Sequence, residues 1–372
     1  MSPDVIVVGG GVIGTSISYQ LAKAGRRVTL FERNSIGSGA TGASAGMIMP
    51  ARDPAAPASF AALTGQSARL FPALAAELQE RTGTDIAYRR AGVLEVAFDD
   101  AEAEMLRRQR GWEIDRGGAV AWLDSNDVRE IEPAVNTAVR AAIYHADDHQ
   151  LMPLTFAQAL GRAAADLGAV VSEGVAVDAL QIEADRVAGV VVGGVLHRAE
   201  EVVIATGSWS AAWSAQAGIA IPVRPVRGQI VALRTPGTAL RTVLEGAGGY
   251  VVAKPDGRVL AGTTVEEAGF DARPTAGAIA TLLQRAARLS PRLSEATVVS
   301  SWAGLRPATA DGLPIIGRVS MRAGLTLATG HFRNGILLAP VTGELITDLI
   351  LRRKPRFDIE AFDPNRFESR AA

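Results

Sequence analysis

The sequence predicts an α/β protein that combines a parallel sheet flanked by helices with a second, α+β domain built on a largely antiparallel sheet. Three observations support this prediction. Short, continuously apolar runs, typical of buried parallel strands, stand near the start, the middle and the end of the chain. A glycine-rich turn joins the first run to an amphipathic helix. Between these segments lie strand-like runs separated by turn residues, which favour antiparallel pairing.

The N-terminal segment predicts a right-handed βαβ unit. Val5 to Val8 is apolar throughout, as expected for a strand that is buried on both faces. Gly25 stands where the C-cap of the following helix belongs, and residues 28–31 form the next buried strand, which ends at Glu32. The helix between them carries an apolar stripe with four-residue spacing, made of Ile13, Ile17 and Leu21.

The remaining chain alternates between helices and strands. Residues 36–59 are rich in small residues and are expected to lie close to a ligand. The patterns predict helices at 61–81, 100–110, 153–167 and 274–289, and a closing helix after Gly330. They predict strands at 92–98, near 170, and at 175–182, 187–192, 202–205, 222–233, 250–253, 259–262 and 325–328.

Because the parallel-sheet elements are scattered along the chain, both domains are expected to be discontinuous. We expect one domain to comprise residues 1–88, 146–221 and 304–356. The second domain should comprise residues 89–145 and 222–303, and residues 357–372 should form a C-terminal tail.

Composition excludes several classes of protein. The chain has 372 residues, 48% of them apolar and 21% charged, with a net charge of −1, so neither nucleic acid nor an anionic membrane is an expected partner. It contains no cysteine, which excludes disulfides, thiolate metal sites and a cysteine nucleophile. No signal peptide precedes the first strand, and the most apolar helix is interrupted by charges, so we expect a cytoplasmic protein.

One group of residues could in principle bind a metal ion. His145, Asp147, Asp148 and His149 lie within five positions of one another. Four ligands so close together in one loop rarely converge on one ion. We therefore expect no metal site.

The first motif with chemical meaning is G-x-G-x-x-G between the first strand and its helix. Its glycines are Gly9, Gly11 and Gly14. Such glycines allow a tight turn, close approach to a pyrophosphate and contact between helix and strand, while the helix start attracts the phosphates. Glu32 has the spacing of a carboxylate that binds a ribose hydroxyl. Together they predict a Rossmann-like dinucleotide site, without deciding between FAD and NAD.

A second turn of this kind near the C-terminus favours a flavin. Residues 327–336 again run from a strand through a glycine turn at Gly330 into a helix. A second helix start facing the same ligand would stabilise the negative charge of a reduced flavin, which a nicotinamide ring does not need. Because the chain has no cysteine, no flavin can be attached through sulfur.

The order of several motifs resembles the D-amino acid oxidase and glycine oxidase family of flavoproteins. These motifs are Gly9–Gly14, Glu32-Arg33, residues 44–47, residues 205–207 and Gly330–Ile336. The stretches 302–307 and 330–340 are similar to the glycine oxidase branch in particular. The resemblance covers nearly the whole chain and is looser over residues 100–250. It implies that the first domain binds FAD non-covalently and the second binds substrate.

The resemblance also implies roles for individual residues. Arg306 would hold the substrate carboxylate, with Tyr250 as its phenol partner and Arg333 at a second contact. The implied FAD contacts are Gly9, Gly11, Val12, Ile13, Gly14, Glu32, Arg33, Ala40, Thr41, Ala45, Gly46, Met47, Val175, Gly207, His331, Phe332, Arg333, Asn334, Gly335, Ile336 and Leu337. The sequence departs from the family in the bare segment 246–249 and at Val265, so the size of the substrate is left open.

The activity implied by the resemblance is oxidation of glycine, and of other small amines such as sarcosine or D-alanine, to an imine and then an oxo acid. Dioxygen would be reduced to hydrogen peroxide, and the imine would supply thiamine thiazole biosynthesis. The family also implies a homotetramer. Arg306 orients the carboxylate in this hypothesis, and no side-chain base is needed if the amine is neutral.

Three alternatives stay open. One is a D-amino acid dehydrogenase that passes electrons to a quinone, and another is a secondary-amine oxidase. The third is a non-catalytic dinucleotide-binding protein.

Overall fold

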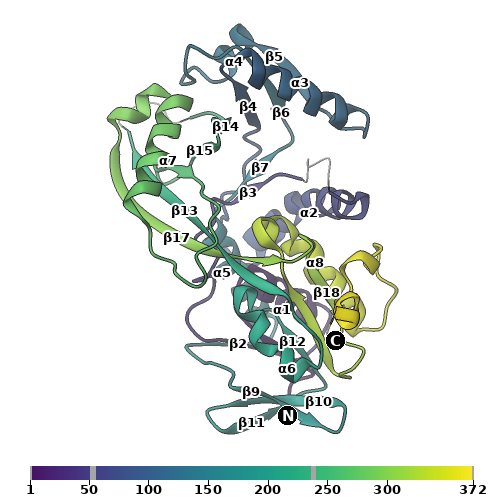
Figure 1. The fold of residues 1–372 in the computed structure, drawn as a ribbon. Helices are drawn as coiled ribbons and strands as arrows, with labels where there is room; N and C mark the ends of the chain where they lie inside the picture. The colour runs from purple at the N-terminus through teal and green to yellow at the C-terminus, as the bar shows by residue number, and fades with distance from the viewer. Residues whose placement is uncertain (1, 51–55, 236–239, 371–372) are drawn as a thin grey trace.

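The computed structural model describes residues 2–50, 56–235 and 240–370. They form two large sheets, and this architecture confirms the predicted fold class (Figure 1). Long strands β13 (Val223–Arg234) and β17 (Thr297–Thr309) cross from the part of the molecule that contains α7 to the part that contains α1 and β12.

The first sheet has six strands and is parallel except at one edge. Its order is β18 (Ile315–Arg318), β19 (Leu325–Thr329), β12 (Glu201–Ile204), β1 (Val5–Val8), β2 (Val28–Glu32) and β8 (Val170–Glu173), and only β18 is antiparallel to its neighbour. Strands β1, β12 and β19 are buried along their whole length, because both faces of the sheet are covered.

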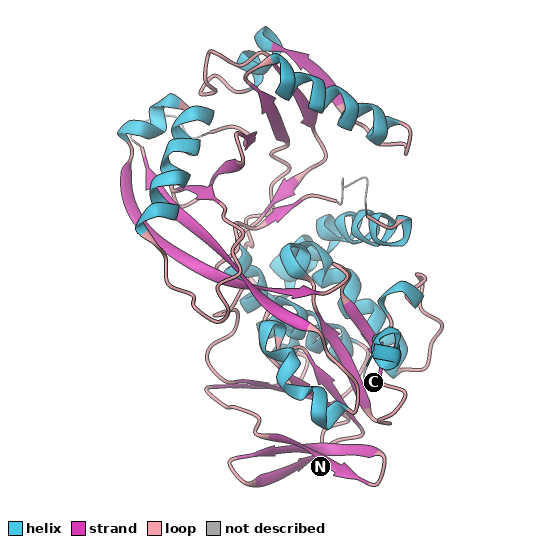
Figure 2. Ribbon diagram, in the orientation of Figure 1, coloured by secondary structure: helices cyan, strands magenta, loops and turns pink. Residues whose placement is uncertain are grey.

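One face is covered by helices and the other by a smaller sheet and short helices. The helices are α1 (Val12–Lys23), α2 (Ala58–Thr82), α5 (Pro153–Asp166) and α8 (Gly335–Ile350), which share one core with β1. The opposite core includes β9 (Ala179–Glu183), β10 (Arg186–Val192), the 3-10 helix η1 (Gly207–Trp213) and α6 (Ser214–Ala217). Strand β10 pairs with β9 on one side and with β11 (Val195–Arg198) on the other, in a separate sheet at the foot of the view in Figure 2.

The second sheet has eight strands and is antiparallel except between β4 and β14. Its order is β17, β13, β16 (Val259–Gly262), β15 (Gly249–Ala253), β14 (Val243–Gly246), β4 (Val93–Ala97), β6 (Ala141–His145) and β5 (Ala121–Asp124). Helix α7 (Ala276–Leu289) covers part of one face, and α3 (Asp100–Ile114) and α4 (Ser125–Ile131) pack against the β4–β6–β5 end. A short ladder of β3 (Met47–Ile48) and β7 (His149–Gln150) lies between the two halves.

One expected strand needs correction, and several strands of the structure were not expected. The strand expected at 175–182 begins only at Ala179, and its first residues form a loop. The pattern did not indicate β11, whose residues are mostly exposed. It also missed β17, whose first residues, 297–301, are exposed on both faces and show no alternation. The domain boundaries stay a prediction, and β17 runs without interruption through the one at residue 304.

Helices α1 and α8 pack closely against each other. Ser16 Oγ donates a hydrogen bond of 2.6 Å to the carbonyl of Ala339. A Cβ atom on Gly343 would lie 2.6 Å from Ser16 Oγ and 2.9 Å from Ser16 O, so only glycine allows this distance between the helices. Among the described residues, none of the helices combines the length and the apolarity that crossing a membrane would need.

Changing Gly343→Ala should lower the free energy of unfolding by about 1–3 kcal/mol, because the added methyl group forces the two helices apart. Denaturant unfolding would measure this. Gly111→Ala in α3 is the control, since an added Cβ there meets nothing within 4 Å. That change should instead stabilise the protein by about 0.5–1 kcal/mol. Equal effects of the two changes would contradict the packing argument.

Buried Lys254 predicts a pH dependence of stability. Its Nζ donates to Gln150 Oε1 at 3.0 Å and to the Leu151 carbonyl at 3.1 Å, and burial lowers its pKa from 10.5 to about 7. Between these values the unfolded chain binds more protons than the folded chain, so the free energy of unfolding should rise with pH. Urea unfolding at about pH 7.5 and 9.5 should show a smaller rise for Lys254→Met. An undiminished rise in that variant would assign the effect to other groups.

Candidate active site

One large cavity is lined by residues from both large sheets. Its volume of about 1470 Å³ exceeds the roughly 300–1,000 Å³ of ordinary small-ligand pockets. Its wall contains every residue that the sequence analysis assigned to cofactor or substrate, except Gly14. These residues are Gly9, Gly11, Val12, Ile13, Glu32, Arg33, Ala40, Thr41, Ala45, Gly46, Met47, Val175, Gly207, Tyr250, Arg306, His331, Phe332, Arg333, Asn334, Gly335, Ile336 and Leu337.

The three glycines of the first motif have different surroundings. Gly9 has a φ of 109°, and a Cβ there would lie 2.5 Å from the carbonyl of Ala205. A Cβ on Gly14 would lie 1.9 Å from the Gly9 carbonyl, so Gly14 lies beneath the turn and brings helix and strand together. A Cβ on Gly11 would meet only Thr41 Oγ1, at 3.5 Å. The cavity therefore faces bare backbone at the start of α1, as a pyrophosphate requires.

Residues around this turn hold it in place. Thr41 Oγ1 accepts a hydrogen bond of 3.0 Å from the Val12 N–H. Glu32 accepts from the Gly10 N–H at 2.6 Å and from the Asn34 N–H at 2.8 Å, one to each carboxylate oxygen. An ionised carboxylate has further lone pairs, so Glu32 remains able to accept ribose hydroxyls.

A stack of side chains that the sequence analysis missed continues this wall. The Arg33 guanidinium lies 3.9 Å from the centroid of the Trp209 ring, and both residues line the cavity. The ring of Phe270 lies 5.6 Å from that of Trp209. The three residues come from distant parts of the chain, so no local pattern could have joined them.

The second helix start differs slightly from the expectation. Gly330 has a φ of 74°, and a 3-10 turn over Phe332–Asn334 precedes α8, which begins at Gly335. His331 Nε2 lies 3.1 Å from Thr342 Oγ1. Burial lowers the pKa of His331 to about 3, so the imidazole is neutral at physiological pH. Its hydrogen bond into α8 agrees with a structural role rather than that of a base.

Arg306 and Tyr250 reach the cavity over two glycines. Arg306 on β17 lies across Gly228 on β13, where a Cβ would come within 2.1 Å of its Nη2. The Tyr250 ring lies over Gly262 on β16, where a Cβ would come within 2.5 Å of the ring. Gly228 lies inside an expected strand and Gly262 is the last residue of another, and a glycine in a strand indicates close approach of another group. That signal was present in the sequence and was overlooked.

The electrostatics of this end of the cavity favour an anion. Arg306 donates from Nη2 to Thr263 Oγ1 at 2.7 Å and from Nη1 to the Thr264 carbonyl at 3.0 Å. Burial lowers the pKa of Arg306, and the positive charge of Arg333 lowers it further. Burial also raises the pKa of Tyr250, which keeps its phenol protonated as a donor. Two cations and a hydroxyl around one space suit a carboxylate.

Three of the four metal-capable residues of the 145–149 segment have separate side-chain partners. His149 Nδ1 lies 3.0 Å from the Tyr88 hydroxyl, and Asp147 forms an ion pair with Arg90. His145 Nδ1 lies 3.5 Å from Glu113 Oε2. In the part of the chain that the structure describes, no group of three or more His, Asp or Glu residues is placed to hold a metal ion.

These features define a dinucleotide-dependent oxidoreductase. The turn at Gly9–Gly14 and the carboxylate of Glu32 suit the pyrophosphate and ribose of a dinucleotide. The second helix start at α8 lies in the wall of the same cavity, as the ring of a flavin requires. The residues present therefore fit FAD.

Comparison with known proteins identifies the family. The family model for DAO, FAD dependent oxidoreductase, matches residues 4–349. Glycine oxidase of Geobacillus kaustophilus (strain HTA426) is 40% identical over 98% of this chain and 97% of its own. The crystal structure of glycine oxidase from Geobacillus kaustophilus superposes with a TM-score of 0.92 over 98% of each chain. The crystal structure of iminodiacetate oxidase from Chelativorans sp. BNC1 is 29% identical in sequence. It superposes with a TM-score of 0.89 over 97% of this chain and 98% of that chain.

The chain therefore belongs to the DAO family of FAD-dependent oxidoreductases. Within this family it is a glycine oxidase-like enzyme.

Changing Gly228→Ala should displace the Arg306 guanidinium and weaken the binding of carboxylates at least about tenfold, because misplacement of a binding group by about 1 Å is costly. Titration of the FAD-loaded protein with acetate, followed by the flavin absorbance, would measure the dissociation constant. The FAD content should not change, since Gly228 lies at the arginine end of the cavity. Wild-type affinity for acetate would show that Arg306 does not bind the carboxylate.

Proposed function

We propose that this protein is an oxidase of small amino acids that uses non-covalently bound FAD, with glycine as the main substrate. The observation that carries the proposal is the pair of arginines, Arg306 and Arg333, beside Tyr250 in a cavity that also contains the dinucleotide turn. The cation pair would bind the amino acid carboxylate. The 40% identity to a glycine oxidase supports glycine as the substrate.

FAD, when bound, would accept two electrons from the C–H bond of the amine and pass them to dioxygen, which becomes hydrogen peroxide. Arg306 would hold the carboxylate through two parallel hydrogen bonds, which fix orientation as well as charge. Tyr250 would donate a hydrogen bond from its phenol O–H to the same carboxylate. The start of α8 would stabilise negative charge near the ring. The released imine would react with water to give the oxo acid and ammonia.

Proton transfer by a side chain is not part of this proposal. His331 is neutral and lies within hydrogen-bond distance of Thr342. A substrate that binds with a neutral amine needs no base from the protein, so the chain would act by orientation and electrostatics.

The substrate range stays a proposal. Val265 lines the cavity and is 69% exposed, and the bare segment 246–249 is the tight turn between β14 and β15. Neither closes the pocket with a large side chain, which leaves room for sarcosine or D-alanine. The bifunctional protein ThiO/ThiG of Trichormus variabilis, 34% identical over the whole of this chain, supports a link to thiamine thiazole biosynthesis. Homotetramer formation and cytoplasmic location remain predictions.

A secondary-amine oxidase is the second candidate, favoured by the similarity to iminodiacetate oxidase. Anaerobic mixing of the FAD-loaded protein with glycine, sarcosine, iminodiacetate and D-alanine in turn would separate the candidates. The amine that bleaches the flavin fastest is the substrate. Oxygen consumption during turnover would distinguish an oxidase from a quinone-dependent dehydrogenase. A flavin that no amine bleaches would indicate a non-catalytic protein.

Changing Arg306→Ala should lower kcat/KM for glycine roughly 30- to 5,000-fold. This corresponds to a loss of about 2–5 kcal/mol of transition-state stabilisation, the cost of removing one partner of a buried charge pair. Steady-state oxygen consumption would measure it. Arg306→Lys is the matched control, because it keeps the charge but loses the planar guanidinium. Its kcat/KM should lie between those of the wild type and of Arg306→Ala. Unchanged kinetics of the alanine variant would remove Arg306 from the site.

A further inference from the structure

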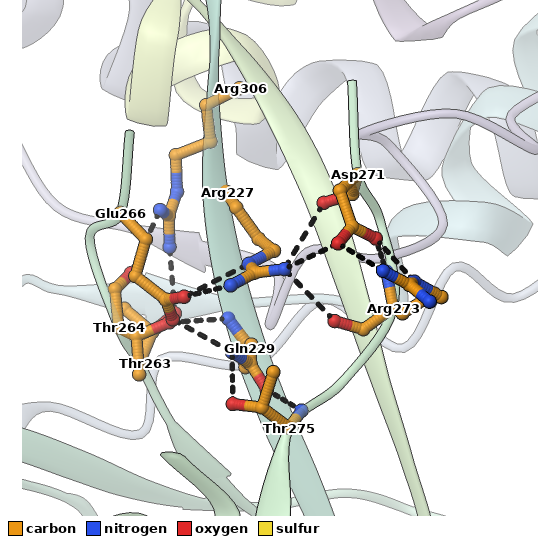
Figure 3. Close-up of polar contacts among 9 residues, drawn as sticks. All are labelled: Arg227, Gln229, Thr263, Thr264, Glu266, Asp271, Arg273, Thr275 and Arg306. Carbon is orange, nitrogen blue, oxygen red and sulfur yellow. Dashed lines mark hydrogen bonds and ion pairs between the residues drawn. The ribbon is translucent and has the colours of Figure 1, made fainter. Parts of the chain in front are cut away.

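A polar cluster connects Arg306 to the neighbouring strand and to the loop that holds its guanidinium. Figure 3 shows its members, which belong to β13, to β17 and to the loop between β16 and α7. They are Arg227, Gln229, Thr263, Thr264, Glu266, Asp271, Arg273, Thr275 and Arg306. The proposed reaction uses only Arg306 from this set, so the arrangement of the others needs an explanation.

The loop of residues 263–275 presents two faces. Thr263 and Val265 line the cavity, and Thr263 Oγ1 accepts from Arg306. Thr264 and Glu266 point the other way, toward Gln229. This alternation is that of extended backbone, in which successive side chains lie on opposite faces. The position of one face therefore fixes that of the other.

Gln229 binds both ends of this loop. It is fully buried on β13, and its backbone N–H donates to Thr264 Oγ1 at 2.9 Å. Its Nε2 donates to Glu266 Oε1 at 2.8 Å and to Thr275 Oγ1 at 3.2 Å. Its Oε1 accepts from the Thr275 N–H at 2.7 Å. Gln229 thus binds the start of the loop through its backbone N–H, and its side-chain amide joins Glu266 to Thr275 at the end of the loop.

Arg227 fills the centre of the loop. Its backbone pairs with that of Glu266 through hydrogen bonds of 2.9 and 3.0 Å, and its Nε donates to Glu266 Oε2 at 2.9 Å. Its Nη1 donates to the carbonyls of Asp271 at 3.4 Å and Arg273 at 3.3 Å. The loop therefore surrounds the Arg227 guanidinium, and Gln229 binds the end of the loop at Thr275.

We infer that Gln229 is a positioning residue for the carboxylate-binding arginine. By fixing residues 263–275 it holds the Thr263 hydroxyl and the Thr264 carbonyl, which together orient the guanidinium plane of Arg306. Long side chains such as arginine have many rotamers, so a fixed plane reduces the entropy lost when a carboxylate binds. This inference rests on the proposed function, in which Arg306 binds the substrate carboxylate.

Changing Gln229→Met tests the inference, because methionine has a similar volume and makes none of the three hydrogen bonds of the side-chain amide, while the backbone N–H that donates to Thr264 stays. In the FAD-loaded protein, the dissociation constant of acetate and the KM for glycine should rise about tenfold or more. The kcat value should change less, and the FAD content should stay that of the wild type. Acetate is the probe because it carries the carboxylate without the amine.

Two further variants make the result specific. Val231→Ala is the matched control, since Val231 is fully buried on the same strand and belongs to the core cluster under α7. It should lower the melting temperature and leave acetate affinity within about twofold. Thr264→Val removes the acceptor of the Gln229 N–H while the carbonyl that holds Arg306 stays. It should weaken acetate binding in the same direction even if Gln229→Met fails to fold.

The outcomes separate the two hypotheses. If Arg306→Ala weakens acetate binding but Gln229→Met and Thr264→Val do not, the positioning role is wrong and the proposed function stands. If Arg306→Ala also leaves acetate binding unchanged, both are overturned. A lower melting temperature of Gln229→Met with wild-type acetate affinity would show a purely structural role.

Discussion

The close packing of α1 against α8 is the constraint on which the rest of the site depends. Strands β1 and β19 lie in one parallel sheet, so the helices that follow them begin at the same edge of it. The Ser16–Ala339 hydrogen bond and the absence of a side chain at Gly343 then bring the helices together. As a result both helix starts face one cavity, and their free amides and dipoles act on a single ligand.

The second sheet also contributes groups that bind an anion, and it too depends on glycines that allow close approach. Glycine at Gly228 and Gly262 clears a path across the sheet, along which Arg306 and Tyr250 lie. Neither side chain could lie flat on a strand that carried a Cβ atom at these positions. The two glycines contribute no side-chain packing, but they allow the Arg306 cation and the Tyr250 phenol to lie at fixed positions relative to the nucleotide turn.

The charges of the cavity account for the kind of substrate that we propose. Arg306 is partly buried and lies near a second cation, Arg333, so both burial and repulsion act against its charge. A bound carboxylate would relieve both costs at once. His331 is neutral and adds no charge, which leaves the arginines and the start of α8 as the groups that attract negative charge.

The sequence alone determined the class of fold, the dinucleotide turn, Glu32 and the second helix start, because each depends on residues within about one turn or one strand of each other. It failed where the information was not local. The exposed half of β17 has no alternation, and the stack of Arg33 on Trp209 joins distant segments. Only the tertiary structure connected Gln229 to Arg306. Strand register brings β13, β17 and the 263–275 loop together, and that register is set by the packing of the whole sheet.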